Sequence, residues 1–307
     1  MSFRNDYFLY AKNNEKANVE FSNGLNLINT SSEVLSSIFS QSLRSGIHGL
    51  CFSMYEDGQK PGDHISEEQV RRRLKIIAPY TKWVRSFSCI EGNEFVPKIA
   101  RELGMKTLVG AWLGDDAEKN EKEMEALIQL AKEGFVDIAA VGNEVMYRKD
   151  LTEDELLVFI NKARKEIPAH IPVGYVDAYY EFTIKPRITE ACDVILTNCY
   201  PYWEGTNQEY ALSHMKSMYH QALAAGNGKK VIITETGWPS HGESFKDSHP
   251  SPENAMKYFI NTQIWSLNEN IEVFYFSSFD ESWKVGPEGE VGAHWGIWDK
   301  DEKLKFI

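Results

Sequence analysis

The stretch that decides the fold is Val231–Ser240, which reads VIITETGWPS. Apolar and β-branched residues run directly into the carboxylate of Glu235, and Gly237 and Pro239 then prevent the chain from continuing as a strand. An ionisable group at the end of an apolar strand costs desolvation free energy, so a sequence that places one there usually uses it. For an isolated Glu, a strand that simply becomes polar as it leaves the core would be the better explanation.

A second stretch of the same kind lies at Val136–Val145, which reads VDIAAVGNEV. It is again a short apolar run, and it ends in the polar pair Asn143 and Glu144. Two apolar strands that each end in a carboxylate favour a functional interpretation of both Glu144 and Glu235.

Strand and helix patterns alternate along the rest of the chain. Helices begin at S/T-x-x-E/Q capping boxes, as at Ser66 and Thr152, and end at glycines such as Gly104 and Gly134. Further strands are predicted at residues 49–54, 83–88, 106–111, 172–176, 193–198 and 273–279. Eight strand–helix units without a linker favour an α/β fold, a single (β/α)8 TIM barrel over residues 46–307. An open doubly wound sheet is the alternative, but no Gly-rich phosphate loop follows the first strand.

Residues 1–45 precede the predicted barrel as an N-terminal extension. Apolar residues at helical spacing predict an amphipathic helix over residues 32–43, which could plug the bottom of the barrel. Residues 1–24 are polar and Asn-rich, which is typical of a tail or a hairpin.

The composition restricts the partners of the protein. The formal net charge is -12, which disfavours nucleic acid and anionic membrane surfaces. No apolar stretch is long enough to span a bilayer, so we expect no membrane partner. We also expect a monomer. Residues Met1–Asp6 lack the apolar core of a signal peptide. The sequence therefore predicts a cytoplasmic protein if the chain is intact, and a periplasmic or secreted one if a leader has been removed.

Residue types that bind metals show no metal-binding spacing in this sequence. The eight histidines form neither a His-x-His nor a His-Glu-x-x-His pattern, so a catalytic metal is not expected. The cysteines lie in or beside predicted strands and are interpreted as buried thiols, with a disulfide as the alternative. They are Cys51, Cys89, Cys192 and Cys199.

Two carboxyl groups at one barrel mouth are the minimum apparatus for glycoside hydrolysis. Active sites of barrels lie at the C-terminal ends of the strands, where Glu144 and Glu235 both fall. One carboxyl group must be protonated to donate to the leaving oxygen, and the other must be ionised. Arg85, at the end of the second predicted strand, is expected to keep Glu235 ionised. A separation of about 5 Å between the carboxyl groups would predict retention of configuration.

Aromatic residues gather just after the predicted strands, where sugar rings can stack on them. The candidates for sugar contact are Tyr55, Trp112, Tyr200, Tyr202, Trp203, Trp238, Trp283 and Trp295. Core packing is the alternative explanation, and it is preferred for Trp83 and Trp265, which lie within a predicted strand and a predicted helix.

Three segments closely resemble the signature segments of glycoside hydrolase family 17, the β-1,3-glucanase family of clan A. They read VGNEV at residues 141–145, TETGWPS at 234–240 and FDESWK at 279–284. The resemblance covers about residues 46–307 and is closest to the bacterial branch of the family. It implies a retaining (β/α)8 barrel with Glu144 as acid/base, Glu235 as nucleophile and no cofactor.

The same resemblance implies roles in substrate binding. Asn143 would hydrogen-bond the 2-hydroxyl of the sugar at the point of cleavage, and Tyr200 would lie beside the nucleophile. Glu281 and Lys284 would form a charged pair that lines the donor subsite. The implied activity is double-displacement cleavage of β-1,3-glucan polysaccharide or oligosaccharide of the laminarin type. An exo-acting β-1,3-glucosidase, a β-1,3-glucan transglycosylase and a β-glucan-binding barrel without catalysis are the alternatives.

The sequence also departs from the family pattern. Phe87 stands where the plant members usually have Tyr, which weakens any expectation of a hydroxyl contact there. The loops Glu56–Asp63 and His241–Ser251 are longer than expected, and either could close one end of the groove. An open groove would favour endo cleavage, whereas a blocked one would favour exo trimming or glucosyl transfer.

Overall fold

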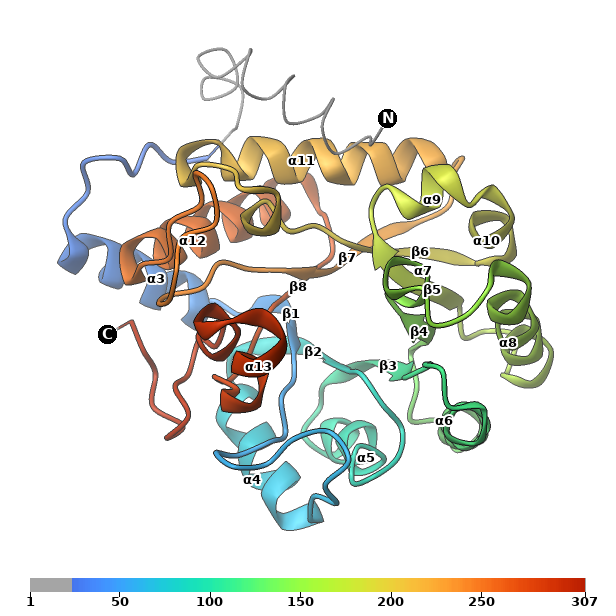
Figure 1. Ribbon diagram of the computed structural model, residues 1–307. Helices are drawn as coiled ribbons and strands as arrows, with labels where there is room; N and C mark the ends of the chain where they lie inside the picture. Colours follow the sequence, from blue (N-terminus) through green and yellow to red (C-terminus); the bar gives the residue numbers. More distant parts are fainter. Residues whose placement is uncertain (1–23, 307) are drawn as a thin grey trace.

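The computed structural model describes residues 24–306; residues 1–23, which carry most of the predicted tail or hairpin, and residue 307 lie outside this range. Within it, parallel strands pair in sequence order and close into a barrel at the centre of the molecule (Figure 1). The closure is direct, because β1 also pairs with β8. The strands are β1 Ile47–Cys51, β2 Thr81–Ser86, β3 Lys106–Ala111, β4 Ile138–Asn143, β5 Val173–Ala178, β6 Val194–Asn198, β7 Val231–Thr236 and β8 Val273–Tyr275. The predicted (β/α)8 barrel is therefore confirmed, and the open doubly wound sheet is wrong.

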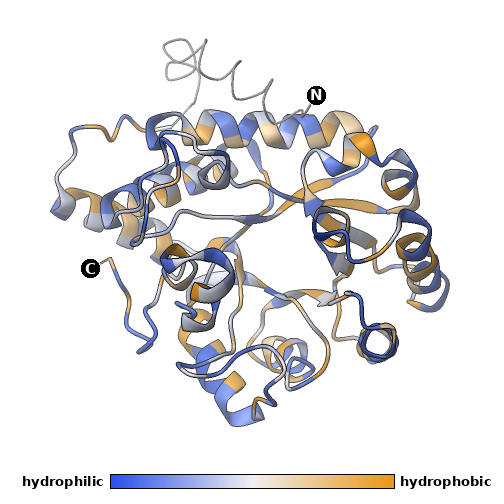
Figure 2. Cartoon of the chain, in the orientation of Figure 1, coloured by the Kyte–Doolittle hydropathy of each residue, from blue (hydrophilic) through white to orange (hydrophobic). Residues whose placement is uncertain are grey.

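Helices surround the barrel and cover its outer face (Figure 1). The longer ones are α3 Ser32–Arg44, α4 Glu67–Ile77, α5 Phe95–Glu102, α6 Ala117–Lys132, α8 Glu153–Glu166, α11 Gln208–Ala225 and α12 Pro252–Glu269. The shorter ones are α7 Val145–Arg148, α9 Glu181–Ile184, α10 Pro186–Ala191 and α13 Val285–Glu288, with 3-10 turns η1 Tyr202–Glu204, η2 Ser282–Lys284 and η3 Glu290–Ala293. Figure 2 shows largely hydrophobic strands at the centre and helices of mixed hydropathy around them, as expected when each helix buries one face.

The two predicted capping boxes differ in the structure. At α8 the box is complete, because the Thr152 hydroxyl accepts from the Glu155 amide and the Glu155 carboxylate accepts from the Thr152 amide. At α4 the Ser66 hydroxyl accepts from the Gln69 amide, but the Gln69 side chain donates to the Met54 carbonyl at 2.8 Å. The predicted return bond to Ser66 is therefore wrong, since Gln69 instead fixes the loop that follows β1.

Strand β8 is shorter than the predicted range 273–279. It ends at Tyr275, because the following backbone bonds to other parts of the chain. The Ser277 amide donates to the Trp295 carbonyl at 3.0 Å, and the Ser278 amide donates to the Cys51 carbonyl at 2.9 Å. The C-terminal segment is thereby held against the barrel mouth.

Helix α3 belongs to the outer ring and does not plug the bottom of the barrel, so that hypothesis is wrong. It packs mainly along α12 and also touches β1 (Figure 1). The Phe39 ring lies 4.7 Å from the Phe259 ring of α12 and 5.1 Å from the Phe306 ring, measured between centroids. The Ser36 hydroxyl also donates to the Phe306 carbonyl at 2.9 Å. In the described part of the chain after β8, residues 276–306, the helices are short, and α3 lies beside α12 in the outer ring.

This packing predicts that the N-terminal helix stabilises the barrel. Leu35→Ala removes a side chain of α3 with no exposed surface and should lower the free energy of unfolding by about 2–4 kcal/mol. The adjacent Val34 is half exposed, so Val34→Ala should change the free energy of unfolding by less than about 0.5 kcal/mol. Urea unfolding of both variants measures the difference, and equal midpoints would contradict the role assigned to α3.

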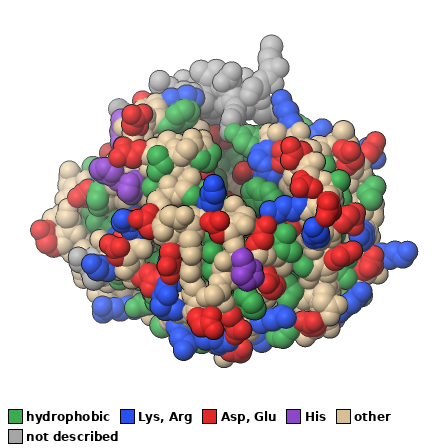
Figure 3. Space-filling view, turned by 60° about the horizontal axis from the view of Figure 1, so that its bottom comes forward, with side chains coloured by type: hydrophobic (Ala, Val, Ile, Leu, Met, Phe, Trp, Pro, Cys, Tyr) green, Lys and Arg blue, Asp and Glu red, His purple; other side chains and the backbone are tan. Residues whose placement is uncertain are grey.

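The structure also bears on the surface charge, the membrane prediction and the state of the cysteines. On the face seen in Figure 3, acidic and basic side chains are interspersed. Within residues 24–306, no helix is both long enough and apolar enough to cross a membrane. Cys51, Cys89, Cys192 and Cys199 are all buried free thiols, so the disulfide alternative is wrong.

Candidate active site

The carboxyl groups of Glu144 and Glu235 meet at the C-terminal mouth of the barrel. The side-chain nitrogen of Asn198, at the end of β6, donates to Glu144 Oε1 at 2.9 Å and to Glu235 Oε1 at 3.1 Å. The two acceptor oxygens can therefore be no further apart than the sum of these distances, 6.0 Å. The Thr234 hydroxyl donates to Asn198 Oδ1 at 2.9 Å, which orients the amide with its nitrogen toward the carboxylates.

The backbone at these strand ends is irregular. The pairing of β6 with β7 shifts in register, so that Asn198 lies opposite Glu235. Glu144 adopts a left-handed backbone conformation with φ 53°, and its amide donates to the Val176 carbonyl of β5 at 2.7 Å. Irregularities of this kind redirect side chains and are common beside active sites. Here they bring both carboxyl groups to one point.

Three donors converge on the Glu235 carboxylate. Arg85 Nη1 donates to Oε1 at 2.7 Å, and the Tyr200 hydroxyl donates to Oε2 at 2.7 Å. Asn198 supplies the third hydrogen bond. Arg85 is buried and also donates from Nη2 to Asn143 Oδ1 at 2.7 Å. The predicted proximity of Arg85 and Tyr200 to Glu235 is thus present, and three hydrogen bonds fix the direction of this carboxyl group.

Glu144 lies in a different environment. Burial raises the pKa of Glu144 above its usual range, and the negative charge of Glu235 raises it further. The hydrogen bond from Asn198 opposes this shift, and it is outweighed. Glu144 is therefore biased toward its protonated form, as an acid requires, whereas Glu235 is held by a guanidinium and two further donors, as an attacking group requires.

This difference predicts the pH dependence of activity. An acid must be protonated to act, so activity should fall as pH rises through the raised pKa of Glu144. Glu144→Gln should lower kcat on a glycoside with a poor leaving group by about 10²–10⁴-fold and abolish this alkaline limb. An aryl glycoside with an acidic phenol should largely keep its kcat/KM, because departure of the phenol needs no proton, while its kcat should still fall because the later attack of water lacks its base.

The measurement is a pH–rate profile of each protein on both substrates. Glu125→Gln, on the exposed side of α6, is a control that should keep the parent profile. An unchanged alkaline limb in Glu144→Gln would show that another group supplies the proton.

The predicted pair of Glu281 and Lys284 lies on the β8 side of the mouth. Lys284 Nζ is 2.7 Å from Glu281 Oε2, and both side chains are buried. Glu281 Oε1 accepts from the Ser53 hydroxyl at 2.7 Å and from Trp283 Nε1 at 3.1 Å. The half-buried Tyr55 ring meets Trp283 edge to face at 6.2 Å. Loops that follow β1 and β8 therefore form one polar and aromatic wall.

Trp112 lies on another part of the rim, directly after β3. The Arg148 guanidinium sits over its ring at 4.4 Å from the centroid. Arg148 also donates to the carbonyl oxygens of Asn143 and Leu113, and its Nε donates to Asp150 at 2.7 Å. One face of the indole is therefore covered by Arg148, and the loops after β3 and β4 are fixed to each other.

Three aromatic residues predicted to contact sugar lie in the core instead. Tyr202 and Trp238 are 0% and 1% exposed, and their rings pack edge to face at 5.3 Å. The Tyr202 hydroxyl donates to the Glu243 carbonyl, and Trp238 Nε1 donates to the His249 carbonyl. Neither offers a free ring face. Trp295 is likewise only 3% exposed, so the prediction of sugar stacking on these three residues is wrong.

Two residues of the site escaped the sequence interpretation. Asn198 ends β6 just as Asn143 ends β4, so its position at a strand end could have predicted that it belongs to the site. Asp177, buried in β5, accepts from the Ala178 amide at 2.7 Å and from the Tyr147 amide at 3.3 Å. Burial raises the pKa of Asp177 to about 8. Nothing local distinguished Asp177, because its role is to hold the backbone that follows Glu144.

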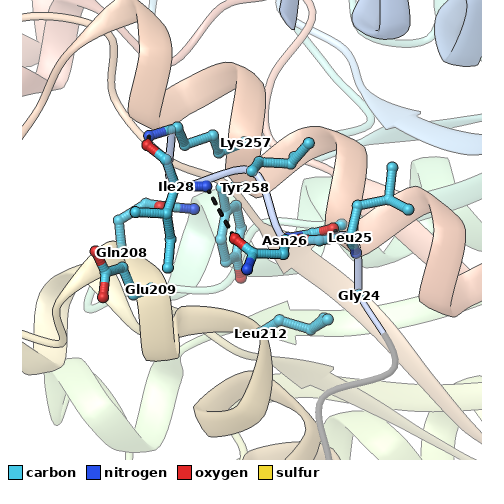
Figure 4. A pocket seen from close by; sticks show the side chains of 11 residues that line it. Gly24, Leu25, Asn26, Ile28, Gln208, Glu209, Leu212, Lys257 and Tyr258 are labelled. Carbon is cyan, nitrogen blue, oxygen red and sulfur yellow. Dashed lines mark hydrogen bonds between the residues drawn. The ribbon is translucent and has the colours of Figure 1, made fainter. Parts of the chain in front are cut away.

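A separate pocket lies on the outer ring, away from the carboxyl groups. It is formed by residues Gly24–Ile28 with side chains of α11 and α12 (Figure 4). Asn261 fixes this segment, because its side chain accepts from the Leu25 amide at 2.8 Å and donates to the Leu25 carbonyl at 3.2 Å. None of the predicted site residues lines this pocket.

A closed parallel barrel with two carboxyl groups side by side at the ends of β4 and β7 defines the class of barrel glycoside hydrolases. Residues 49–296 match the family described as the BtgE/BtgC glycoside hydrolase domain, and the chain belongs to this family. The resemblance to glycoside hydrolase family 17 is thereby confirmed at the level of the family.

Characterised relatives share most of their length with this chain. A glucan 1,3-β-glucosidase of Candida albicans is 29% identical over 76% of this chain and 83% of its own. The corresponding protein of Saccharomyces cerevisiae is 28% identical over 87% and 93%. The crystal structure of a family 17 β-1,3-glucanosyltransferase of Rhizomucor miehei is 30% identical, has a TM-score of 0.75, and covers 85% of this chain and 96% of that one. These relatives are fungal, and the bacterial branch stays a prediction.

Proposed function

We propose that this protein is a retaining enzyme that cleaves β-1,3-glucosidic bonds by double displacement. The observation that carries the proposal is that one Asn198 nitrogen donates to both carboxyl groups. The distance between the two acceptor oxygens is therefore at most 6.0 Å. Retaining enzymes have carboxyl groups about 5–5.5 Å apart, whereas inverting enzymes need about 6.5–9.5 Å to admit a water molecule.

In the first step, Glu235 attacks the anomeric carbon while Glu144 donates its proton to the glycosidic oxygen. The bond from the anomeric carbon to that oxygen breaks, and the leaving sugar departs with the proton. The glucosyl unit remains as an ester of Glu235, and the negative charge of the carboxylate is consumed. Arg85 and Tyr200 hold the attacking carboxylate in position before the reaction.

In the second step, Glu144 is ionised and acts as a base. It takes a proton from water, the hydroxyl oxygen attacks the anomeric carbon, and the ester bond to Glu235 breaks. Asn143 accepts a hydrogen bond from Arg85 at Oδ1, so its side-chain NH2 group is directed away from Arg85 and donates to the 2-hydroxyl of the bound sugar. We assign the wall of Glu281, Lys284 and the adjacent aromatic rings to the donor side of the substrate.

The substrate class follows from the relatives, which are named as glucan 1,3-β-glucosidases or as a β-1,3-glucanosyltransferase. The candidate residues named here come from one chain, which is compatible with a monomer. Transfer is a second candidate activity, because a glucanosyltransferase is among the solved structures that share 30% identity with this chain. In transfer, a sugar hydroxyl replaces water in the second step.

The deciding experiment is a time course of laminari-oligosaccharide digestion with products resolved by size. Products shorter than the substrate support the proposed cleavage, and their anomeric form at early times should be β. Products longer than the substrate identify transfer. Glucose released alone from the start identifies exo action. An absence of any product would overturn the proposed function in favour of a binding barrel or another linkage.

A further inference from the structure

We propose that Phe245, together with Trp203, forms an outer sugar-binding subsite that selects longer β-1,3-glucan chains. The inference deepens the proposed function and rests on it. Phe245 was not among the residues indicated by the sequence. It lies in the loop between β7 and α12, at the same end of the barrel as the carboxyl groups.

Phe245 is held on a rigid turn. Its amide and carbonyl both pair with Ser248, at 3.0 Å each, across a turn in which Lys246 has φ 52°. The Ser248 hydroxyl is fully buried and lies 2.9 and 2.8 Å from the carbonyl oxygens of Tyr202 and Thr206. The turn is therefore fixed to the segment that carries Trp203.

An aromatic row connects this turn to the nucleophile. The Phe245 and Trp203 ring centroids are 6.3 Å apart, and Trp203 lies 5.6 Å from Trp295. Trp295 lies 5.5 Å from Tyr200, whose hydroxyl binds Glu235. Exposure rises outward along the row, from the buried Trp295 through the half-buried Trp203 to Phe245 at 39%. Each step is comparable to the length of one pyranose unit.

The chemistry of this row suits a carbohydrate. A single exposed apolar residue needs no functional explanation, but Phe245 extends a row that starts at the reacting centre. Aromatic faces bind the apolar C–H faces of sugars, while flanking polar groups meet the hydroxyls. Glu243, Ser244 and Asp247 are exposed in the same loop, and Lys246 Nζ lies 5.3 Å from the centroid of the Phe245 ring. A preorganised ring also costs little conformational entropy on binding.

The experiment compares kcat/KM on laminaritriose and on laminarihexaose. Phe245→Ala should raise KM for the hexasaccharide by about three- to tenfold, the range of one aromatic contact, with kcat retained. The rise in KM for the trisaccharide should be much smaller, because a short chain bound across the carboxyl groups ends before Phe245. Phe245→Tyr keeps an aromatic face and should restore the parent value.

Leu267→Ala is the matched control, because Leu267 is 65% exposed on α12 and lies outside the row. It should leave both substrates unaffected. If Phe245→Ala lowers kcat/KM equally on both chain lengths, or on neither, the subsite is overturned while the proposed function stands. If the parent protein cleaves neither oligosaccharide, the proposed function fails and the subsite fails with it. Thermal unfolding of Phe245→Ala at the parent temperature excludes a folding defect.

Discussion

Glu235→Gln is expected to lower kcat on β-1,3-glucan by about 10⁴-fold or more, the largest effect among the variants considered. The amide keeps the shape of the carboxylate and can still meet Tyr200 and Asn198. It cannot form the glucosyl ester, so the first step has no nucleophile. Binding of laminari-oligosaccharides, measured by calorimetry, should be largely retained. Turnover at the parent rate would show that Glu235 is not the nucleophile.

The stereochemistry of rescue separates the roles of the two carboxyl groups. With an activated aryl glucoside and azide, Glu235→Ala should give the α-glucosyl azide, because azide attacks from the face that the carboxylate has vacated. Glu144→Ala should give the β-azide, because the ester on Glu235 still forms and azide then displaces it. Identical anomers from the two variants would contradict the assignment.

Arg85→Met is expected to have the second largest effect, on activity and on stability together. Arg85 is the buried cation that pairs with Glu235, and its removal leaves a carboxylate without its counter-charge. Breaking a buried pair by deleting one partner costs about 3–5 kcal/mol. Urea unfolding should show this loss, and kcat should fall because Glu235 and Asn143 lose their common donor.

Two further variants make this prediction specific. Arg71→Met removes a partly exposed cation that pairs with Glu67 and Glu102, and it should leave the urea midpoint close to that of the parent. Arg85→Lys keeps the charge but lacks the planar fork that reaches Glu235 and Asn143 together. It should therefore recover stability better than activity. An Arg85→Met protein that unfolds at the parent urea concentration would contradict the role of the pair.

Much of the fold could be predicted because its signals are local. Apolar runs such as Val231–Ile233 and Lys106–Ala111 mark buried strands wherever they occur, and the caps at Ser66 and Thr152 mark helix starts. Parallel strands of a closed barrel share one mouth, so the carboxyl group at the end of β4 had to face the same side as that of β7.

The predictions that were wrong concern residues whose surroundings are formed by segments far apart in the chain. Tyr202 and Trp238 follow strands, as an exposed sugar platform would, but they pack on each other inside the fold. Helix α3 was correctly predicted as amphipathic, yet its apolar face fits the outer ring as well as the barrel floor. A hydrophobic pattern states that a face is buried and does not state what covers it.

The sequence by itself determined a barrel with Glu144 and Glu235 at its mouth, because strand periodicity and strand ends are properties of short segments. Only the tertiary structure decided that Asn198 bridges the two carboxylates and that Arg85 joins Glu235 to Asn143. These contacts depend on the register between neighbouring strands and on side-chain directions at their irregular ends. Both are set by packing between segments far apart in the chain, which no local pattern encodes.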